Sequence, residues 1–430
     1  MLSPKLKPVF EEALEIFPGG VNSPVRSFAA VGGTPVVFSR ALGATLWDDS
    51  GRPYGDLVQG WGPHILGHRN PKVEMLVKRQ LGRQWSVGAP TPEENQLGRL
   101  IQIAMPHLER LRLVNSGTEA VMSALRLARA WTGRPLILKM DGGYHGHSDG
   151  LLVRAGSGAA QLAQASSEGV STSTAAQTIS IPFNDLEAVR VALAAYPLQI
   201  AAVIVEPVAA NMGVVLPQPG YLQGLRDLTR AAGVLLIFDE VITGFRVAKG
   251  GAAQRFGVTP DLTCLGKIIG GGLPCGAFGG SRELMDQVAP LGPVYQAGTL
   301  SGNPLTMVAG AAVLQQISKP GFYEDLEDRF LAFYEQLEPM VKNLAHERGW
   351  GPVVLQSCAS LFTVFFSSEE VKDWTSASRC TVKSYSQWFH WMLGRGYFLP
   401  PAQFEACFLG QSHDKAWLNR LLRVLKNGGV

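Results

Sequence analysis

An apolar run that ends abruptly in two carboxylates constrains this chain more than any other segment. Residues Val234–Phe238 are all apolar, and Asp239 and Glu240 follow at once. A run of this length, bounded by a glycine and by charge, is typical of a strand buried on both faces. Carboxylates at the carboxyl end of such a strand lie where open α/β sheets bind their ligands. The segment therefore predicts a buried central strand that delivers Asp239 to a ligand site.

A lysine further along the chain, Lys267, stands between a short apolar strand candidate at 262–265 and the run Ile-Ile-Gly-Gly-Gly at 268–272. An amine in such surroundings loses hydration, which lowers its pKa and leaves it nucleophilic. A desolvated lysine paired with a strand-end aspartate indicates pyridoxal phosphate: the amine forms a Schiff base with the cofactor, and Asp239 keeps the pyridine nitrogen protonated. On these two residues alone, a helix-capping carboxylate and a loop lysine remain alternatives.

The composition excludes several other classes of protein. The chain has 38 basic and 35 acidic residues and no basic block, which argues against a nucleic-acid binder. A hydrophobic content of 46% over 430 residues indicates one large, well-packed domain plus a smaller one. The five cysteines are scattered and form no CxxC pair, which favours reduced thiols over a disulfide frame or a zinc site. With no signal-peptide core and no membrane-spanning run, we expect a cytoplasmic protein.

Strand and helix patterns alternate through the middle of the chain. The expected strands lie at 111–114, 136–139, 200–205, 234–238 and 262–265, and the expected helices at 119–131 and 221–232. This alternation predicts an α/β fold with a mostly parallel, doubly wound sheet. A small antiparallel element is expected between residues 33 and 59, with strands at 35–38 and 45–47. Helices at 304–317 and 322–347 and a strand at 361–366 predict a separate C-terminal lobe. GxGxxG is absent, which weakens a dinucleotide-binding interpretation.

Two polar turns supply groups that a phosphorylated, planar cofactor would need. Residues 115–118, Asn-Ser-Gly-Thr, lie where a strand enters a helix, and amides and hydroxyls at a helix N-terminus bind phosphate. An ordinary helix cap has the same appearance. The run Tyr144-His-Gly-His147 lacks nearby carboxylates or cysteines at ligand spacing, so a ring of Tyr144 or His145 stacked on the cofactor is favoured over a metal.

A stiff loop and an exposed aromatic residue are candidate substrate contacts. Two glycines and two prolines between residues 17 and 28 fix a loop that carries Ser23 and Arg26. An arginine in such a loop suits a bidentate carboxylate receptor, although an exposed arginine is the alternative. Trp61 lies between two glycines, and it could line a pocket or belong to the core.

Two later segments also carry candidate site residues. Residues 155–178 are rich in small and polar side chains without a hydrophobic period, which predicts a structureless lid with Ser157 near its hinge. Glu405 stands between aromatic residues, and a carboxylate there is costly to bury unless it is paired or functional.

These segments together resemble the class III aminotransferases of fold type I and, within that family, the glutamate-1-semialdehyde aminomutases. The sharpest matches are Gly19-Gly-Val-Asn-Ser-Pro-Val-Arg26, Asn115-Ser-Gly-Thr-Glu-Ala120, Tyr144-His-Gly-His147, Ala155-Gly-Ser-Gly158, Asp239-Glu-Val-Ile-Thr-Gly-Phe-Arg246, Leu265-Gly-Lys-Ile-Ile-Gly-Gly-Gly272 and Gln296-Ala-Gly-Thr-Leu-Ser-Gly-Asn-Pro304. The aspartate and lysine segments specify only the broad class. The arginine loop, the Ala155–Gly158 segment and Phe404-Glu405-Ala406 point to the aminomutases. The chain departs from the family pattern at Asn70, where histidine is usual, and at Ala210 and Ala359, where glycine is usual.

The resemblance implies a division of the chain and a set of site residues. It implies an N-terminal segment (1–59) packing with a small α+β domain (311–430), and a large cofactor-binding domain (60–310). The implied cofactor contacts are Lys267 as the Schiff-base lysine and proton carrier, Asp239 on the pyridine nitrogen, Ser116, Gly117 and Thr118 on the phosphate, Tyr144 and Val241 on the ring faces, Asn211 near the ring hydroxyl, and Gly298 and Thr299 from the partner subunit of a homodimer. The implied substrate contacts are Arg26 on the carboxylate, Ser23, Trp61, Ser157 and Glu405, the last close to the amino-transfer centre.

The resemblance also implies a reaction. Pyridoxal and pyridoxamine 5'-phosphate would move an amino group within glutamate-1-semialdehyde to give 5-aminolevulinate for tetrapyrrole synthesis, and a lid would retain the intermediate. One alternative is an intermolecular aminotransferase that acts on a β- or ω-amino acid with a keto-acid acceptor. The other is a catalytically dead relative with a binding role, against which the intact Lys267 and Asp239 argue.

Overall fold

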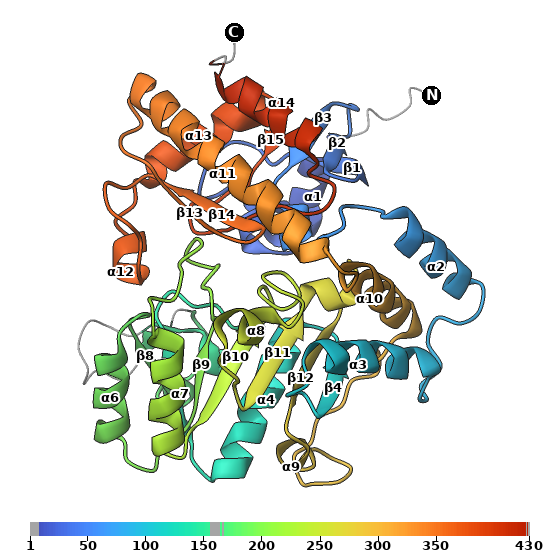
Figure 1. Cartoon of the computed structure of the whole chain (residues 1–430), viewed down its shortest axis with the longest axis vertical. Coiled ribbons are helices and arrows are strands. Elements are labelled where there is room, and N and C mark those ends of the chain that lie inside the picture. The colour runs from blue at the N-terminus through green and yellow to red at the C-terminus, as the bar shows by residue number, and fades with distance from the viewer. Residues whose placement is uncertain (1–7, 155–163, 166, 427, 429–430) are drawn as a thin grey trace.

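The computed structural model describes residues 8–154, 164–165, 167–426 and 428. A large lobe surrounds a seven-stranded sheet, and a smaller lobe contains both ends of the chain (Figure 1). The strand order of the sheet is β4-β12-β11-β10-β9-β5-β8, and only β12 runs antiparallel to its neighbours. The strands are β4 (Arg110–Val114), β5 (Leu136–Met140), β8 (Thr178–Ile181), β9 (Ile200–Val205), β10 (Leu235–Glu240), β11 (Leu262–Gly266) and β12 (Gly276–Gly280). The predicted mostly parallel sheet is confirmed.

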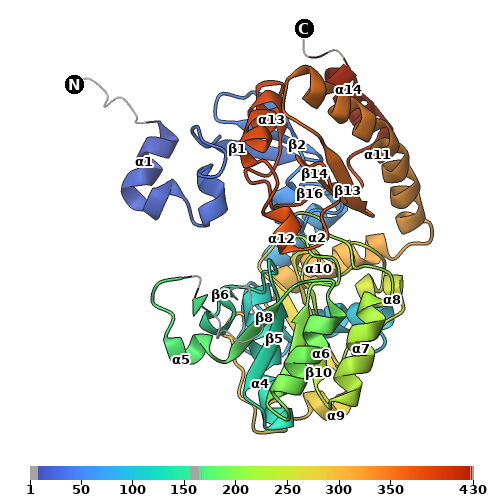
Figure 2. The ribbon, with the colours of Figure 1, turned by 90° about the vertical axis from the view of Figure 1, so that its left-hand side faces the viewer.

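Helices cover both faces of this sheet, as a doubly wound fold requires. Helix α4 (Gly117–Thr132) lies on one face, and α6 (Leu186–Ala195) and α7 (Tyr221–Ala231) lie on the other (Figure 2). Successive residues of β10 serve the two faces in turn: Ile237 packs with the apolar stripe of α4, whereas Phe238 packs with residues of α6 and α7. Both faces are therefore buried, which is why the strand is apolar throughout until Asp239.

The remaining elements of the large lobe surround the sheet and its carboxyl edge. They are α2 (Pro71–Leu81), α3 (Pro92–Ala104), the hairpin β6 (Val153–Arg154) and β7 (Gln164–Ala165), α5 (Thr172–Ala175), α8 (Gly251–Phe256), α9 (Arg282–Met285) and α10 (Pro304–Ile317). The family's usual histidine is replaced at the start of α2 by Asn70, whose side chain accepts hydrogen bonds from the Lys72 and Val73 amides. This departure therefore provides a helix cap.

The small lobe joins the two ends of the chain in one sheet. Strands β1 (Phe38–Leu42), β2 (Thr45–Asp48) and β3 (Pro53–Asp56) pair in order, and β15 (Tyr397–Phe398) adds in parallel to β3. A second sheet contains β13 (Val354–Cys358), β14 (Leu361–Phe365) and β16 (Cys407–Phe408), and the helices are α11 (Phe322–Glu347), α12 (Trp374–Ala377), α13 (Val382–Gly394) and α14 (Lys415–Lys426). The N-terminal segment thus belongs structurally with the C-terminal lobe. The predicted domain limits stay predictions, and the one at 310/311 falls within α10.

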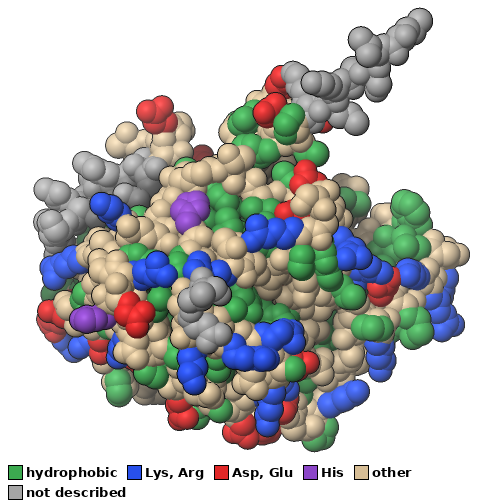
Figure 3. All heavy atoms as spheres, turned by 90° about the horizontal axis from the view of Figure 1, so that it is seen from above, with side chains coloured by type: hydrophobic (Ala, Val, Ile, Leu, Met, Phe, Trp, Pro, Cys, Tyr) green, Lys and Arg blue, Asp and Glu red, His purple; other side chains and the backbone are tan. Residues whose placement is uncertain are grey.

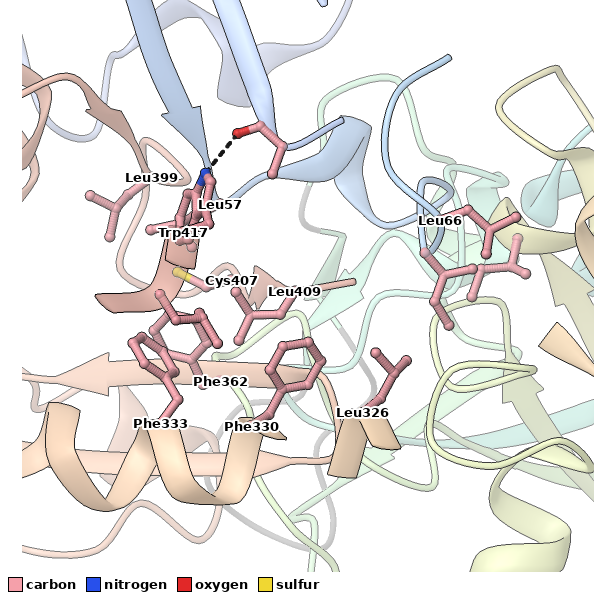
Figure 4. Packing of buried hydrophobic residues seen from close by; sticks show 14 of the residues in the cluster. Leu57, Leu66, Leu326, Phe330, Phe333, Phe362, Leu399, Cys407, Leu409 and Trp417 are labelled. Carbon is pink, nitrogen blue, oxygen red and sulfur yellow. Dashed lines mark hydrogen bonds between the residues drawn. The ribbon is translucent and has the colours of Figure 1, made fainter. Parts of the chain in front are cut away.

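The core of the small lobe draws on distant parts of the sequence. Phe330 and Phe333 of α11, Phe362 of β14 and Trp417 of α14 belong to one buried apolar cluster with Leu57 (Figure 4). Each is nearly inaccessible to solvent, so their burial ties the N-terminal strands to the C-terminal helices through the hydrophobic effect.

Two local predictions are wrong. The first strand begins at Phe38 rather than at residue 35, because residues 34–37 make no strand pairing. The stretch 155–178 is not structureless in its described part, which contains β7, α5 and the start of β8. Ser157 lies outside the described residues.

Helix α1 (Val9–Ile16) stands apart from the rest of the chain (Figures 2 and 3). None of its residues is buried, and Val9, Leu14 and Ile16 are at least half exposed, at 50%, 52% and 61%. Such a set of exposed apolar side chains on one short helix is typical of a surface that contacts another chain. No helix in the described part of the chain is long and apolar enough to cross a bilayer.

Candidate active site

A cavity of about 210 Å³ opens at the carboxyl ends of β9, β10 and β11, where an open α/β sheet is expected to bind its ligand. Its lining comes from the sheet, from the start of α4 and from the loop after β5. The lining residues are Gly117, Thr118, Tyr144, His145, Gly146, Glu206, Asn211, Asp239, Val241, Ile242 and Lys267. The structure therefore brings seven of the predicted cofactor contacts, among them Lys267 and Asp239, into one cavity.

Lys267 follows β11 directly and occupies the left-handed region, with a φ of 46°. This conformation is costly for a residue with a side chain, and such residues cluster at functional sites. Burial lowers the pKa of Lys267, whereas the nearby carboxylates of Asp239, Glu206 and Glu405 act to raise it. The net direction is downward, so the neutral, nucleophilic amine is more accessible than in a surface lysine.

Asp239 is the penultimate residue of β10, lines the cavity and is only 5% exposed. One oxygen accepts a hydrogen bond from the Val241 amide at 3.1 Å. The other lies 2.8 Å from Nδ1 of His145, a distance at which Nδ1 donates to the carboxylate. These two bonds fix the orientation of the carboxylate.

His145 thus has a different role from the predicted one. Its ring is 2% exposed, so it supports Asp239 from behind and is not a free stacking surface. Its Nε2 is buried and has no hydrogen-bond partner within the described parts of the chain. Among these residues no three His, Cys, Asp or Glu side chains gather as a metal site would require. Sequence reasoning could not pair His145 with Asp239, because the contact joins the loop after β5 to strand β10, which is far away in the chain.

Glu206 is a second site residue to which the sequence analysis assigned no role. Glu206 follows directly after β9, just as Asp239 lies at the carboxyl end of β10. Burial raises the pKa of Glu206. Its carboxylate accepts hydrogen bonds from the Tyr144 amide at 3.0 Å, the Ala210 amide at 3.1 Å and the Asn211 side chain at 2.8 Å. Glu206 therefore holds together the two loops that carry Tyr144 and Asn211. The available signal was its strand-end position after an apolar run.

The start of α4 has the features that the predicted phosphate cradle needs, although its binding of phosphate stays a prediction. Ser116 caps the helix, with its hydroxyl accepting from the Glu119 amide at 3.2 Å. The amides of Gly117 and Thr118 belong to the first turn of the helix, whose N–H groups lack intrahelical partners. Side chains would fill the cradle: a Cβ at Gly117 would lie 2.9 Å from the Val241 methyl groups, and one at Gly146 would lie 2.6 Å from the Thr118 hydroxyl.

The residues present therefore fit pyridoxal phosphate. A dry amine, a fixed carboxylate and an anion-binding helix end meet in a cavity that glycines keep open. Tyr144, whose side chain is half exposed, and Val241 lie on its wall, where the prediction places them against the ring faces.

Glu405 belongs to the small lobe but acts on the same cavity. Burial raises the pKa of Glu405 to about 7, while the charge of Lys267 opposes this shift and that of Glu206 adds to it. Glu405 is not among the residues that line the cavity, but its carboxylate interacts electrostatically with the Lys267 amine. No backbone or side-chain group of the described chain donates a hydrogen bond to this carboxylate, in contrast to those of Asp239 and Glu206.

Trp61 lies on a loop whose next residue, Gly62, is packed closely against the Lys267 side chain. The loop is held by buried Asp56, whose carboxylate lies 2.7 Å from Nε2 of His68 and accepts from two amides of the loop. The residue after Trp61 is Gly62, and a Cβ there would lie 3.2 Å from the Lys267 side chain. The loop therefore forms a wall beside the amine, with Trp61 half-buried on it.

Four other predicted residues do not line the cavity in the single chain. Arg26 is exposed and Ser23 half-buried on the loop beyond α1. Gly298 and Thr299 are exposed, and Gly298 borders a separate open groove of about 800 Å³. The roles assigned to these residues stay predictions.

Comparisons with known proteins agree with this geometry. The profile of the family described as "Aminotransferase class-III" matches residues 28–353. The chain is 53% identical to the glutamate-1-semialdehyde 2,1-aminomutase of Roseiflexus castenholzii, an alignment that covers 96% of this chain and 94% of that protein. Among solved structures, an omega-transaminase from Sphaerobacter thermophilus matches with a TM-score of 0.87 and 32% identity, covering 98% of this chain and 96% of that one. A variant glutamate-1-semialdehyde-aminomutase from Pseudomonas aeruginosa PAO1, in complex with PMP, matches with a TM-score of 0.85 and 25% identity, covering 98% of this chain and 93% of that one.

The sequence relationship is both close and nearly complete in length, and the site carries the chemical groups that the family's cofactor requires. The chain therefore belongs to the class-III aminotransferase family and, within it, to the glutamate-1-semialdehyde 2,1-aminomutases.

Proposed function

We propose that this protein converts (S)-glutamate-1-semialdehyde into 5-aminolevulinate by moving the amino group within one molecule, with pyridoxal or pyridoxamine 5'-phosphate as cofactor. The observation that carries this proposal is a dry amine at Lys267 that interacts electrostatically with the half-buried carboxylate of Glu405, in a chain 53% identical to a protein named for this activity. The product places the enzyme in tetrapyrrole synthesis.

The cofactor, when bound, supplies an electron-accepting ring. The chain's own residues do the rest. Lys267 attaches the cofactor through its amine and, once released, carries protons between neighbouring carbon atoms of the substrate. Asp239, oriented by His145, holds a proton on the ring nitrogen. The first turn of α4 would hold the phosphate through the Gly117 and Thr118 amides and so anchor the cofactor within reach of Lys267.

Glu405 supports amino transfer within one molecule over transfer between two. An intermolecular enzyme must admit a keto acid with its carboxylate beside the carbonyl carbon that reacts. A second carboxylate held near that position repels the first, and the repulsion is strong because the site is buried. An aldehyde carries no such charge. The structural likeness to an omega-transaminase keeps intermolecular transfer as the second candidate.

We also propose a homodimer that completes both sites. Gly298 and Thr299 lie on an exposed loop, where they could reach a neighbouring chain's phosphate, and Tyr295 and Leu300 beside them are 72% and 55% exposed. Helix α1 likewise presents apolar side chains that nothing in the described chain covers. Burying these surfaces against a second copy would immobilise the loop that carries Arg26. An arginine that binds a carboxylate with both nitrogens needs such a fixed orientation.

The enzyme is proposed to act in the cytoplasm, since all five cysteines are free thiols and buried.

The decisive experiment supplies glutamate-1-semialdehyde alone. Purified protein loaded with pyridoxamine 5'-phosphate is expected to form 5-aminolevulinate over many turnovers, with no keto acid or amino donor present. Consumption of glutamate-1-semialdehyde that stops after one equivalent, with release of the diamine, and resumes only on adding an amino donor would support the intermolecular candidate instead. The matched control is Lys267→Ala, which should bind the cofactor but not sustain turnover.

A further inference from the structure

Arg246 is a buried arginine that links three segments of the site. Only 1% of its surface is exposed. It donates to the Ser360 hydroxyl and the Leu409 carbonyl, both at 3.0 Å, and to the Gly62 carbonyl. Its guanidinium carbon also lies 5.1 Å from the centre of the Phe408 ring. One side chain thus connects the loop after β10 with the Trp61 loop and with the small lobe.

Two of these partners, Gly62 and Leu409, are packed against the Lys267 side chain and within the core of the small lobe, respectively. Gly62 is packed so closely that a Cβ there would lie 3.2 Å from Cδ of Lys267 and 2.8 Å from the Phe408 ring. Leu409 lies among the apolar side chains of the small-lobe core (Figure 4). Movement of the small lobe relative to Arg246 would therefore displace the wall on which the Lys267 stem rests.

The charge of Arg246 is left without a counterion. It makes no ion pair with any carboxylate in the described part of the chain, and its Nε has no hydrogen-bond partner there. The hydroxyls of Tyr323 and Tyr334 on α11 lie in electrostatic range but are neutral, and burial lowers the pKa of Arg246 to about 10. Burying a cation without a counterion is unfavourable for folding, so the presence of Arg246 here points to a role beyond packing.

We propose that Arg246 is a positioning residue for amino transfer: it clamps Gly62 between the Lys267 stem and the small lobe, and thereby fixes the amine relative to the carboxylate of Glu405. The proposal rests on the cofactor chemistry proposed above and extends it to a residue that touches neither cofactor nor substrate. The clamp also brings a positive charge near the amine. Of the charged groups around Lys267, Asp239, Glu206 and Glu405 favour its protonated form, and Arg246 alone opposes it.

The test compares three variants of the cofactor-loaded enzyme. Arg246→Gln removes the charge and shortens the clamp, whereas Arg246→Lys keeps the charge but cannot bond three carbonyl and hydroxyl groups in one plane. Arg226→Gln is the matched control, because Arg226 is also buried, at 7% exposure, but pairs with Asp261 under the sheet. Two quantities are measured: the kcat with glutamate-1-semialdehyde, and the pH midpoint of the cofactor's absorbance change, which reports protonation of the nitrogen that joins it to Lys267.

Arg246→Gln is expected to raise the absorbance midpoint by about half a pH unit or more, since a nearby cation is removed. It should also lower kcat about tenfold with a smaller change in KM, since the amine is displaced but the substrate carboxylate site is intact. Arg246→Lys should restore the native midpoint while kcat stays reduced. Arg226→Gln should lower the melting temperature and move neither quantity.

An unchanged midpoint and kcat in Arg246→Gln would overturn the proposal, and so would equal changes in the control. If the glutamine variant does not fold, Arg246→Met, of similar length and without charge, replaces it with the same expected shifts. The absorbance titration needs no substrate. It therefore still tests the role of Arg246 if the protein does not catalyse the proposed mutase reaction.

Discussion

Replacing Glu405 by glutamine should change how the stability of the protein depends on pH. Burial raises the pKa of this carboxyl from 4.5 to about 7. A carboxyl with a raised pKa in the folded state favours folding while it is protonated. Its stabilising contribution is full below pH 4.5, and it is lost as the pH rises through 7. At 1.36 kcal/mol for each pH unit, the loss amounts to about 3 kcal/mol of unfolding free energy.

The assay is urea denaturation of the cofactor-free protein at pH 5 and pH 8, following fluorescence and circular dichroism. Between these values the native protein should lose about 2.5 kcal/mol more than Glu405→Gln, because glutamine has no charge to desolvate. Exposed Glu335 on α11 supplies the control: Glu335→Gln should follow the native pH dependence. If Glu405→Gln also followed the native protein within about 0.5 kcal/mol, burial would not govern this carboxyl and the reasoning would be refuted.

Three further outcomes are expected. Lys267→Ala should abolish covalent trapping of the cofactor by borohydride, and labelling that persisted in the variant, located by mass spectrometry, would place the attachment elsewhere. Gly117→Ala should weaken cofactor binding about tenfold in an equilibrium titration, because its Cβ would lie 2.9 Å from the Val241 methyl groups; unaltered affinity would contradict a closed cradle. Ala359→Gly should raise the unfolding free energy by about 0.5–1 kcal/mol in urea, because Ala359 has a φ of 50°, and a loss of stability would show that the turn is unstrained.

Elements with uninterrupted local signals were predictable to within a residue or two. Strand β9 coincides with its predicted limits because six apolar residues run between polar neighbours, and burial on both faces needs no other information. Helices α10 and α11 also begin and end as predicted. Each starts after a residue suited to a helix cap, at Asn303 or Gly321, and contains a long helix-forming run.

Strand β12 shows where local signals fail. Its sequence, Gly-Ala-Phe-Gly-Gly, contains three glycines, which weaken a strand taken by itself. The neighbouring chain explains them: a Cβ at Gly276 would lie 2.2 Å from the Ser116 carbonyl oxygen, and one at Gly279 would lie 2.6 Å from that of Arg110. The strand therefore owes its glycines to close approach by β4 and the phosphate cradle. That reason exists only in the folded protein, so no window of the sequence contains it.

The site residues also fall into two groups: some have a local signal in the sequence, and others depend on partners that only the folded protein brings together. Lys267 and Asp239 could be predicted because each combines an unusual local setting with a chemistry that needs it. His145 and Glu206 could not, because their value lies in the partners that the fold brings to them. The family resemblance supplied a role for Glu405, but its lack of hydrogen-bond donors is a property of the packed structure.

This difference in hydrogen bonding indicates which carboxylate can exchange protons during turnover. Glu206 accepts three hydrogen bonds and Asp239 two, and these bonds hold both carboxylates in place. Glu405 is desolvated without such donors, so its pKa of about 7 lies where enzymes operate. A proton can then pass between Glu405 and Lys267 at little cost, whereas moving one onto Asp239 would break bonds that orient it. The large lobe thus holds the carboxylates that hydrogen bonds orient, and the small lobe contributes a carboxylate that can exchange a proton with Lys267.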